Sequence, residues 1–370
     1  MKAGIIGATG YAGAELVRLL ASHQKIEKLF LSSVSFEGEK IEDVYPNFLG
    51  RISADLVKAE EVVAASDVVF AALPHGVGEQ YAKACVEKQI PFIDLSADFR
   101  FGEDEAGFSA WYDKPYKHPE LREFSVYGLP ELNRRRIREL AASGKVIISN
   151  PGCYPTGASL GAFPALAQGL YNNSAVIIID SASGVSGGGR EPARSFHYPE
   201  CADSVAPYKV ASHRHTPEIA RNFAAMAGNR QAPAIIFTPH LAPMNRGILS
   251  TVYIPLAAEW RLSVPPAAVR PPSDEIESIA TKIRALYTDF YRNEPFVRVL
   301  PKGVIAATNR VRQSNYCDIS VHVDHNGSTL IICSAIDNMV KGAAGQAVQN
   351  MNIIAGIDEE TGLGMIPALF

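Results

Sequence analysis

Cys153 is the residue of this sequence best placed to act as a nucleophile. It lies in the stretch NPGCYPT (150–156), between a β-branched run at 146–149, which predicts a short strand, and a helix with Pro155 in its first turn. The positive end of that helix favours the thiolate over the thiol, and Gly152 leaves the approach to the sulfur open. A lone cysteine is more often an inert core residue. Here glycine and prolines surround it instead of an apolar run, which favours a nucleophile.

The stretch HRHTPE (213–218) contains the best candidates for a base to serve Cys153. Pro217 predicts a helix start, with Thr216 as its N-cap. We prefer His215 as the acid/base because the helix start fixes its backbone, and we keep His213 as the second candidate. Glu218 is expected to orient the histidine ring or to bind substrate. The alternative is a pair of surface histidines. A metal site would need a third ligand, so we predict no metal.

The first strand, at 3–6, runs into GATGYAG (7–13) and then a helix at 14–20. Glycines three apart permit a tight turn, close approach of a pyrophosphate, and close packing of helix on sheet. Such turns also occur without a nucleotide, but a preceding strand favours dinucleotide binding. The predicted cofactor residues of this turn are Gly7, Thr9, Gly10, Tyr11, Ala12 and Gly13.

Three further strands, at 26–31, 66–73 and 90–96, alternate with helices, which predicts a Rossmann-like, doubly wound parallel sheet. Ligands bind such sheets at the carboxyl ends of the strands. We therefore expect cofactor contacts from Ser33 and Ser35, and from Leu73, Pro74 and His75, although His75 also suits a plain turn. Arg100, after the last of these strands, either pairs with Asp98 or anchors an anion.

Serines follow the second strand where an NAD-binding unit commonly has an acidic residue for the ribose 2′-hydroxyl. Serine hydroxyls can hydrogen-bond a 2′-phosphate, which favours NADP. No basic partner is evident beside them, and Lys40 is the nearest in sequence.

The second half of the chain has a different pattern. Strands at 175–180, 234–238, 247–254, 316–323 and 329–333 surround only two long helices, near 216–227 and 273–291, which predicts an α+β domain with a mixed sheet and a face for dimerisation. A glycine-rich loop at 183–190 suits anions or a nicotinamide amide, through Ser186, Gly187 and Gly188. The proline-rich stretch 264–272 predicts a surface loop. A helix of small residues at 337–348 is expected to return to the first domain.

The predicted domains are therefore 1–151 with 335–370, which bind dinucleotide, and 152–334, which hold the nucleophile. A chain of 370 residues allows two domains.

A net charge of −4 argues against nucleic-acid binding. Five scattered cysteines without a CxxC pair indicate reduced thiols and a cytoplasmic protein. No apolar run reaches the length of a membrane span, and no signal peptide is predicted.

The motifs quoted so far, with three more, resemble the N-acetyl-γ-glutamyl-phosphate reductases of the aspartate-semialdehyde dehydrogenase superfamily. The further motifs are ALPHG (72–76), YGLPE (127–131) and DNMVKGAAGQ (337–346). The resemblance implies an NADPH-dependent reductase of arginine biosynthesis that acts on a small acyl phosphate and assembles as a homodimer or homotetramer. It implies a cofactor contact from Asn338 and a substrate contact from Asn150. Val34 departs from the basic residue of many members, so we expect only a modest preference for NADP.

The implied mechanism suits the residues. The Cys153 thiolate attacks the acyl carbon and expels phosphate, hydride reduces the resulting thioester, and the histidine moves the proton. Arg100, Arg190 and Arg246 are candidates to hold substrate phosphate or carboxylate. Two rival hypotheses remain: a related reductase of aspartyl phosphate or of carrier-bound aminoadipyl phosphate, and a nucleotide-binding regulator without catalysis.

Overall fold

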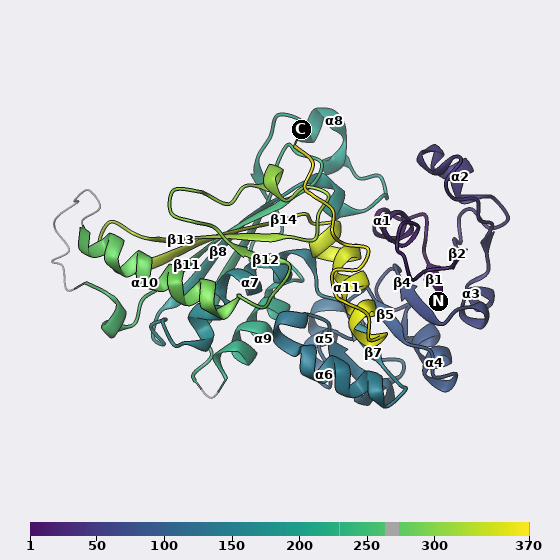
Figure 1. The fold of residues 1–370 in the computed structure, drawn as a ribbon, viewed down its shortest axis with the longest axis horizontal. Helices are drawn as coiled ribbons and strands as arrows, with labels where there is room; N and C mark the ends of the chain where they lie inside the picture. The colour runs from purple at the N-terminus through teal and green to yellow at the C-terminus, as the bar shows by residue number, and fades with distance from the viewer. Residues whose placement is uncertain (229, 263–273, 370) are drawn as a thin grey trace. The chain divides into compact units, whose positions relative to one another are not determined.

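The computed structural model describes residues 1–228, 230–262 and 274–369, and the chain divides into two compact units (Figure 1). The first unit comprises Met1–Gly152, Gly189–Glu191 and Met339–Met365, and the second comprises Cys153–Gly188, Pro192–Asn338 and Ile366–Phe370. The proline-rich stretch 264–272 lies outside the described residues.

This division differs from the predicted one at Gly152 and at three short segments, and a hydrogen bond ties each of the three segments to its unit. Residues 189–191 join the first unit, where Arg190 donates to the carbonyl oxygen of Thr9. Residues 335–338 stay in the second unit, where the backbone N–H of Gly247 donates to Asn338. The last residues also join the second unit, where the N–H of Ala368 donates to the carbonyl of Arg312.

The first unit is built on a seven-stranded sheet whose paired strands are all parallel, in the order β3-β2-β1-β4-β5-β7-β6. The strands are β1 (Lys2–Ile6), β2 (Lys28–Ser32), β3 (Leu56–Val57), β4 (Val68–Ala71), β5 (Phe92–Asp94), β6 (Ser125–Tyr127) and β7 (Ile147–Ser149). The order reverses on either side of β1, which confirms the predicted doubly wound sheet. The two short strands β3 and β6 carry little apolar pattern, and the sequence reading missed them.

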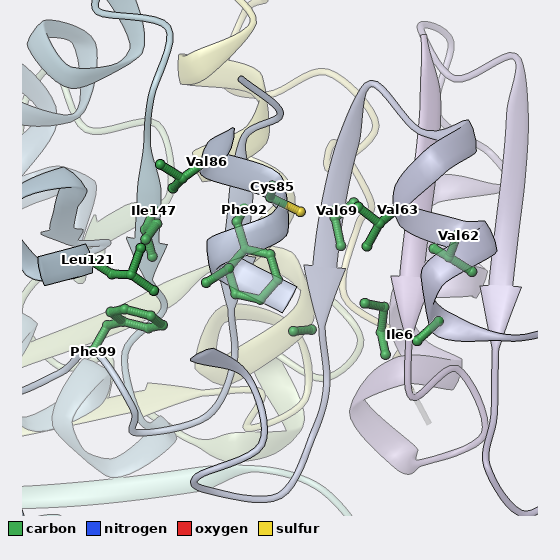
Figure 2. Packing of buried hydrophobic residues seen from close by; sticks show 13 residues of the cluster. Ile6, Val62, Val63, Val69, Cys85, Val86, Phe92, Phe99, Leu121 and Ile147 are labelled. Carbon is green, nitrogen blue, oxygen red and sulfur yellow. The ribbon is translucent and has the colours of Figure 1, made fainter. Parts of the chain in front are cut away.

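Helices pack on both faces of this sheet. The helices of this unit are α1 (Tyr11–Leu20), α2 (Ile41–Val44), α3 (Ala59–Ala65), α4 (Glu79–Glu87), α5 (Glu105–Tyr112), α6 (Pro130–Ala142) and α11 (Gly345–Ile354), and of these α1, α3, α4, α6 and α11 contact the strands. Near-continuous apolar strands, such as the fully buried β4 and β5, need cover on both sides. Figure 2 shows one of the cores, where Val62 and Val63 of α3 and Cys85 of α4 meet Val69 and Phe92 of the sheet.

The C-terminal helix begins differently from the prediction. Residues Val340–Ala344 form a π-helical turn before α11, which packs on α1 and α6. Within the turn, Lys341 is fully buried, and its ammonium lies 2.7 Å from a carboxylate oxygen of Glu131 in α6. This buried ion pair fixes the returning segment to the first unit.

The second unit contains a mixed sheet in the order β12-β13-β14-β11-β8-β10-β9, with both parallel and antiparallel pairs, as predicted. Its strands are β8 (Val176–Ser183), β9 (Ala206–Pro207), β10 (Ala234–Leu241), β11 (Ile248–Pro255), β12 (Val297–Val299), β13 (Cys317–Val323) and β14 (Thr329–Ile336). Buried and less buried positions alternate along β8 and β11, which indicates that one face is covered and the other is not.

The covered face lies under α7 (Cys153–Ala167) and α10 (Asp274–Phe290), while α9 (Thr216–Ala227) packs on α7 and β10. The short helix α8 spans Tyr198–Cys201. Helix α7 is buried almost all round, which allows it to contact the sheet and two other helices. Among the described residues, no helix combines the length and apolar character needed to cross a membrane.

Candidate functional site

Cys153 is the first residue of α7, so the helix begins two residues earlier than Pro155 suggested. Residues 150–152 connect the end of β7 to this helix, so the thiol lies at a helix N-terminus, where a thiolate is favoured. Cys153 is half-buried, whereas Cys85, Cys201 and Cys317 are buried. Burial raises the pKa of Cys85 to about 12 and also raises the pKa of the half-buried Cys333. Those two thiols therefore stay protonated at neutral pH.

Tyr154, the residue after Cys153, contacts both candidate bases. The Tyr154 ring lies edge-on to the rings of His213 and His215, with centroids 5.5 and 5.9 Å away. The two histidine rings are themselves 4.9 Å apart. The structure therefore brings residues 153–154 and 213–215 together, although about 60 residues of chain separate them.

The two histidines differ in their hydrogen bonding and exposure. His213 is buried, and its Nδ1 accepts the backbone N–H of His215 at 3.1 Å. Burial, with the positive charges of Lys209 and Arg214 adding to it, lowers the pKa of His213 to about 4. The neutral His213 ring therefore carries its proton on Nε2 and can donate but not accept there. His215 is half-buried at the start of α9, which favours it as the group that exchanges protons.

The shifted pKa of His213 predicts a pH-dependent stability. Because this pKa falls from 6.5 to about 4 on folding, the unfolded chain binds more protons between these values. The free energy of unfolding should therefore fall as the pH drops from 7 to 5, by on the order of 1 to 2 kcal/mol from this residue. Denaturant unfolding of the protein and of His213→Asn at both pH values measures the difference. Equal pH dependence in the two proteins would contradict a neutral, buried His213.

Two tyrosine hydroxyls join this cluster, and the sequence reading missed their role. The Tyr208 hydroxyl donates to that of Tyr154 at 3.0 Å, and the Tyr154 hydroxyl donates to the carbonyl of His240 at 3.4 Å. Burial raises the pKa of Tyr208 to about 12 and raises that of Tyr154 further. Both tyrosines therefore stay neutral and hold the histidine rings in place. Only the position of Tyr154 next to Cys153 hinted at this in the sequence.

Helix α9 is anchored to the nucleophile helix. The side-chain amide of Asn222 donates to the Ser159 hydroxyl of α7 at 3.0 Å. Glu218, predicted to orient the histidine or to bind substrate, is buried in the first turn of α9. Its role therefore stays a prediction.

The glycine turn of the first unit has the backbone that a bound pyrophosphate requires. Gly7 has φ +87°, which favours glycine, and a Cβ on Gly13 would lie 2.1 Å from the Gly7 carbonyl oxygen. The amides of Gly7 and Ala8 donate to the Ser32 carbonyl, and the hydroxyls of Thr9 and Ser33 are 2.7 Å apart. These contacts join the turn to the end of β2. The residues present therefore fit a dinucleotide.

The loop after β4 is held mainly by Asp98. Its carboxylate accepts the N–H of Gly76 at 2.6 Å and of Gly78 at 3.1 Å, and the Nδ1 of His75 accepts the N–H of Ala97 at 3.0 Å. His75 thus has a structural role in the turn, and its predicted contact with the cofactor stays a prediction. The residues of this loop, Leu73, Pro74 and His75, lie at a strand end of the parallel sheet, as the cofactor hypothesis needs.

The side chains of Arg100 and Asn150 donate hydrogen bonds to backbone carbonyls of the first unit. Arg100 is buried and donates to the carbonyls of Asn150 and Leu95, both at 3.0 Å. The amide of Asn150 donates to the carbonyl of Ala343 at 3.0 Å. These contacts position the backbone of the first unit, and the binding of substrate by Arg100 and Asn150 stays a prediction.

In the second unit, Asn338 holds the glycine-rich loop. Its amide donates to the Ser186 hydroxyl at 3.0 Å, and its oxygen accepts the N–H of Gly247 at 2.7 Å. Gly187 and Gly188 follow Ser186 in a single 3₁₀ turn, Val185–Gly188. Next to it, the guanidinium of Arg246 lies 3.0 Å from a carboxylate oxygen of the buried Asp337, and the two side chains form an ion pair. Arg246 also lines a cavity of about 430 Å³ with Asn245, Asn309 and Arg312.

Arg190 is a candidate to hold substrate phosphate or carboxylate, and this role stays a prediction. Its guanidinium contacts Thr9, Phe36 and Tyr45 of the first unit, beside the glycine turn. Among the described residues, no group of three or more His, Cys, Asp or Glu side chains gathers as a metal site.

Comparison with known proteins places this architecture in a class. Residues 2–140 match the model of the semialdehyde dehydrogenase NAD binding domain, and residues 153–338 match that of the semialdehyde dehydrogenase dimerisation domain. Aspartate semialdehyde dehydrogenase II from Vibrio cholerae, solved with ASA, has a TM-score of 0.68 at 16% identity, covering 96% of this chain and 98% of that one. The enzyme from Candida albicans, solved with NADP, has a TM-score of 0.63 at 17% identity, with the same coverage.

A parallel sheet that matches the NAD binding domain, followed by a mixed sheet that matches the dimerisation domain, assigns the chain to the semialdehyde dehydrogenases. Full-length relatives narrow the class. The chain is 46% identical to the N-acetyl-gamma-glutamyl-phosphate reductase of Clostridium beijerinckii over all of both chains. It is also 46% identical to that of Pelotomaculum thermopropionicum, covering 98% of this chain and 97% of the relative. The chain belongs to the N-acetyl-gamma-glutamyl-phosphate reductase family.

Proposed function

We propose that this chain reduces N-acetyl-γ-glutamyl phosphate to N-acetylglutamate 5-semialdehyde, with release of phosphate, as a step of arginine biosynthesis. NADPH is the proposed reductant and the cytoplasm the proposed compartment. The observation that carries the proposal is Cys153 at the start of α7, whose neighbour Tyr154 packs against His213 and His215. The full-length relatives named for this activity support the choice of substrate.

The residues suit acyl transfer through a thioester. The Cys153 thiolate attacks the acyl carbon, the carbon–oxygen bond to phosphate breaks, and phosphate leaves with the electron pair. The nicotinamide, when bound in its reduced form, supplies the hydride that converts the thioester to a hemithioacetal. Collapse of the hemithioacetal breaks the carbon–sulfur bond, releases the aldehyde and returns the thiolate. His215 moves the proton at the reacting oxygen, while His213 remains neutral beside it.

The reverse reaction gives the most convenient test of this activity. Purified protein mixed with N-acetylglutamate 5-semialdehyde, NADP and inorganic phosphate should form NADPH, and omission of phosphate should prevent it. Aspartate semialdehyde should react with a kcat/KM lower by about 10²-fold or more, because it lacks the acetamido group and one methylene. An equal or higher kcat/KM for aspartate semialdehyde would assign the chain to the related aspartyl phosphate reaction instead.

We also propose that the open face of the second sheet forms a homodimer interface, or one interface of a homotetramer. Ile236 of β10, Ile178 of β8, Tyr253 of β11 and Ile331 of β14 are successive partners across four strands, and so form one apolar row. Ile178 and Ile236 are exposed on the face opposite α7. An apolar sheet face of this kind is typical of subunit contacts. The description of the matched model as a dimerisation domain supports the choice of partner.

The apolar row predicts a change of assembly without loss of the fold. Ile178→Asp combined with Ile236→Asp should convert the assembly to a smaller species, because two charges per protomer would be buried unpaired at the interface. Sedimentation velocity measures the change. Val34→Asp is the matched control, since Val34 is 93% exposed in the first unit. An unchanged sedimentation coefficient in the double variant would place the interface elsewhere.

A further inference from the structure

Arg190 is held against the glycine turn of the dinucleotide-binding unit. Its Nη1 donates to the Thr9 carbonyl oxygen at 3.0 Å, and the Tyr45 hydroxyl donates to the same oxygen at 2.9 Å. One backbone carbonyl thus binds a tyrosine from the segment after β2 and an arginine that follows the glycine-rich loop after β8.

Two aromatic rings orient the guanidinium. Its carbon lies 5.0 Å from the centroid of Tyr45 and 5.2 Å from that of Phe36, within the range of a cation–π contact. Arg190 itself remains exposed, and within the described part of the chain no carboxylate forms an ion pair with it. Contacts with rings and a carbonyl leave the positive charge uncompensated. This arrangement suits a guanidinium that receives an anion.

The residues at the end of β2 indicate which anion Arg190 would bind. Thr9 contacts Ser33 through its hydroxyl and Arg190 through its carbonyl, so the serine and the arginine both contact one residue of the glycine turn. In this fold the adenosine ribose lies at the end of the second strand, where an acidic residue would bind the 2′-hydroxyl of NAD. Here serines occupy the strand end, and the neighbouring Val34 has no charge. The guanidinium of Arg190 could therefore supply the positive charge that the uncharged Val34 does not.

We propose that Arg190 binds the 2′-phosphate of NADP, together with the hydroxyls of Ser33 and Ser35, and so sets the preference for NADP over NAD. The assignment rests on the proposed use of NADPH and replaces the predicted contact between Arg190 and the acyl phosphate. It also accounts for a basic partner that lies more than 150 residues away from the serines in the sequence.

Binding of two cofactor fragments to the full chain separates this proposal from the proposed function. The wild type should bind 2′,5′-ADP more tightly than 5′-AMP in calorimetry. Arg190→Gln should reduce that ratio of affinities by about 10- to 100-fold, since a charge-assisted contact to phosphate is lost. Arg190→Lys should retain part of the ratio. Arg194→Gln is the control, because Arg194 is 91% exposed and pairs with Glu200. The ratio of kcat/KM for NADPH to that for NADH should fall in parallel.

The outcomes that contradict the two proposals differ. A wild type that binds both fragments equally would overturn the use of NADPH, and the Arg190 assignment with it. A wild type that prefers 2′,5′-ADP, with the preference intact in Arg190→Gln, would overturn only the Arg190 assignment. A variant with unchanged fragment binding but a raised KM for the acyl phosphate would return Arg190 to the substrate.

Discussion

Replacing Cys153 with serine should lower kcat for reduction of N-acetyl-γ-glutamyl phosphate by about 10⁴-fold or more, because loss of a covalent nucleophile removes the thioester route. The serine hydroxyl keeps the size of the side chain but is not ionised near neutral pH. Binding of NADPH should stay within about 2-fold, because the glycine turn that fits the dinucleotide belongs to the other unit. Steady-state kinetics and fluorescence titration with NADPH measure the two effects.

Cys333→Ser is the matched control for that experiment. Cys333 is also half-buried, lies in the second unit, and has a pKa raised by burial, so it should keep near-normal activity. Substantial turnover by Cys153→Ser would remove Cys153 from the reaction. Comparable loss in Cys333→Ser would indicate a general effect of thiol replacement on the second unit.

Substitution of His215 by asparagine should lower kcat by about 10²- to 10⁴-fold, the usual cost of a lost acid/base group. His215 is half-buried at the start of α9, and its backbone N–H donates to His213, which fixes the segment. The pH dependence of Cys153 alkylation should also weaken, since the histidine that exchanges protons near the sulfur is gone. Alkylation rates between pH 5 and 9 measure this second effect.

His213→Asn distinguishes the two histidines. Its effect on kcat should be smaller, because the pKa of His213 is lowered to about 4 and the ring is neutral throughout the working range. A larger loss in His213→Asn than in His215→Asn would reverse their roles. Normal rates in both variants would place the proton donor outside residues 213–215.

The sequence predicted the elements whose patterns are strong. Buried β-branched runs indicated β4, β5 and β7, and glycine spacing indicated the turn between β1 and α1. These signals are local, because each needs only a run of apolar side chains or a turn that requires glycine. The edge strands β3 (Leu56–Val57) and β6 (Ser125–Tyr127) lack such a run in the sequence, and they depend on a neighbouring strand for their hydrogen bonds.

The positions of charged side chains were harder to predict. Arg100, Arg190 and Arg246 were each predicted to bind an anion, and the sequence did not predict that Arg100 donates to backbone carbonyls or that Arg246 pairs with the buried Asp337. Partners of this kind lie far away in the sequence, so no spacing announces them. The same holds for Tyr208, whose hydrogen bond to Tyr154 depends on the loop before α9 folding back on α7.

Trapping the acyl-enzyme is the most direct test of covalent catalysis by Cys153. The full chain is mixed with N-acetyl-γ-glutamyl phosphate in the absence of NADPH, quenched in acid and digested, and the peptides are examined by mass spectrometry. The peptide that contains Cys153 should gain the mass of one N-acetylglutamyl group, and addition of NADPH before the quench should remove it. An unmodified Cys153 peptide from protein that is active in the reductase assay, or the acyl group on another residue, would contradict the thioester mechanism.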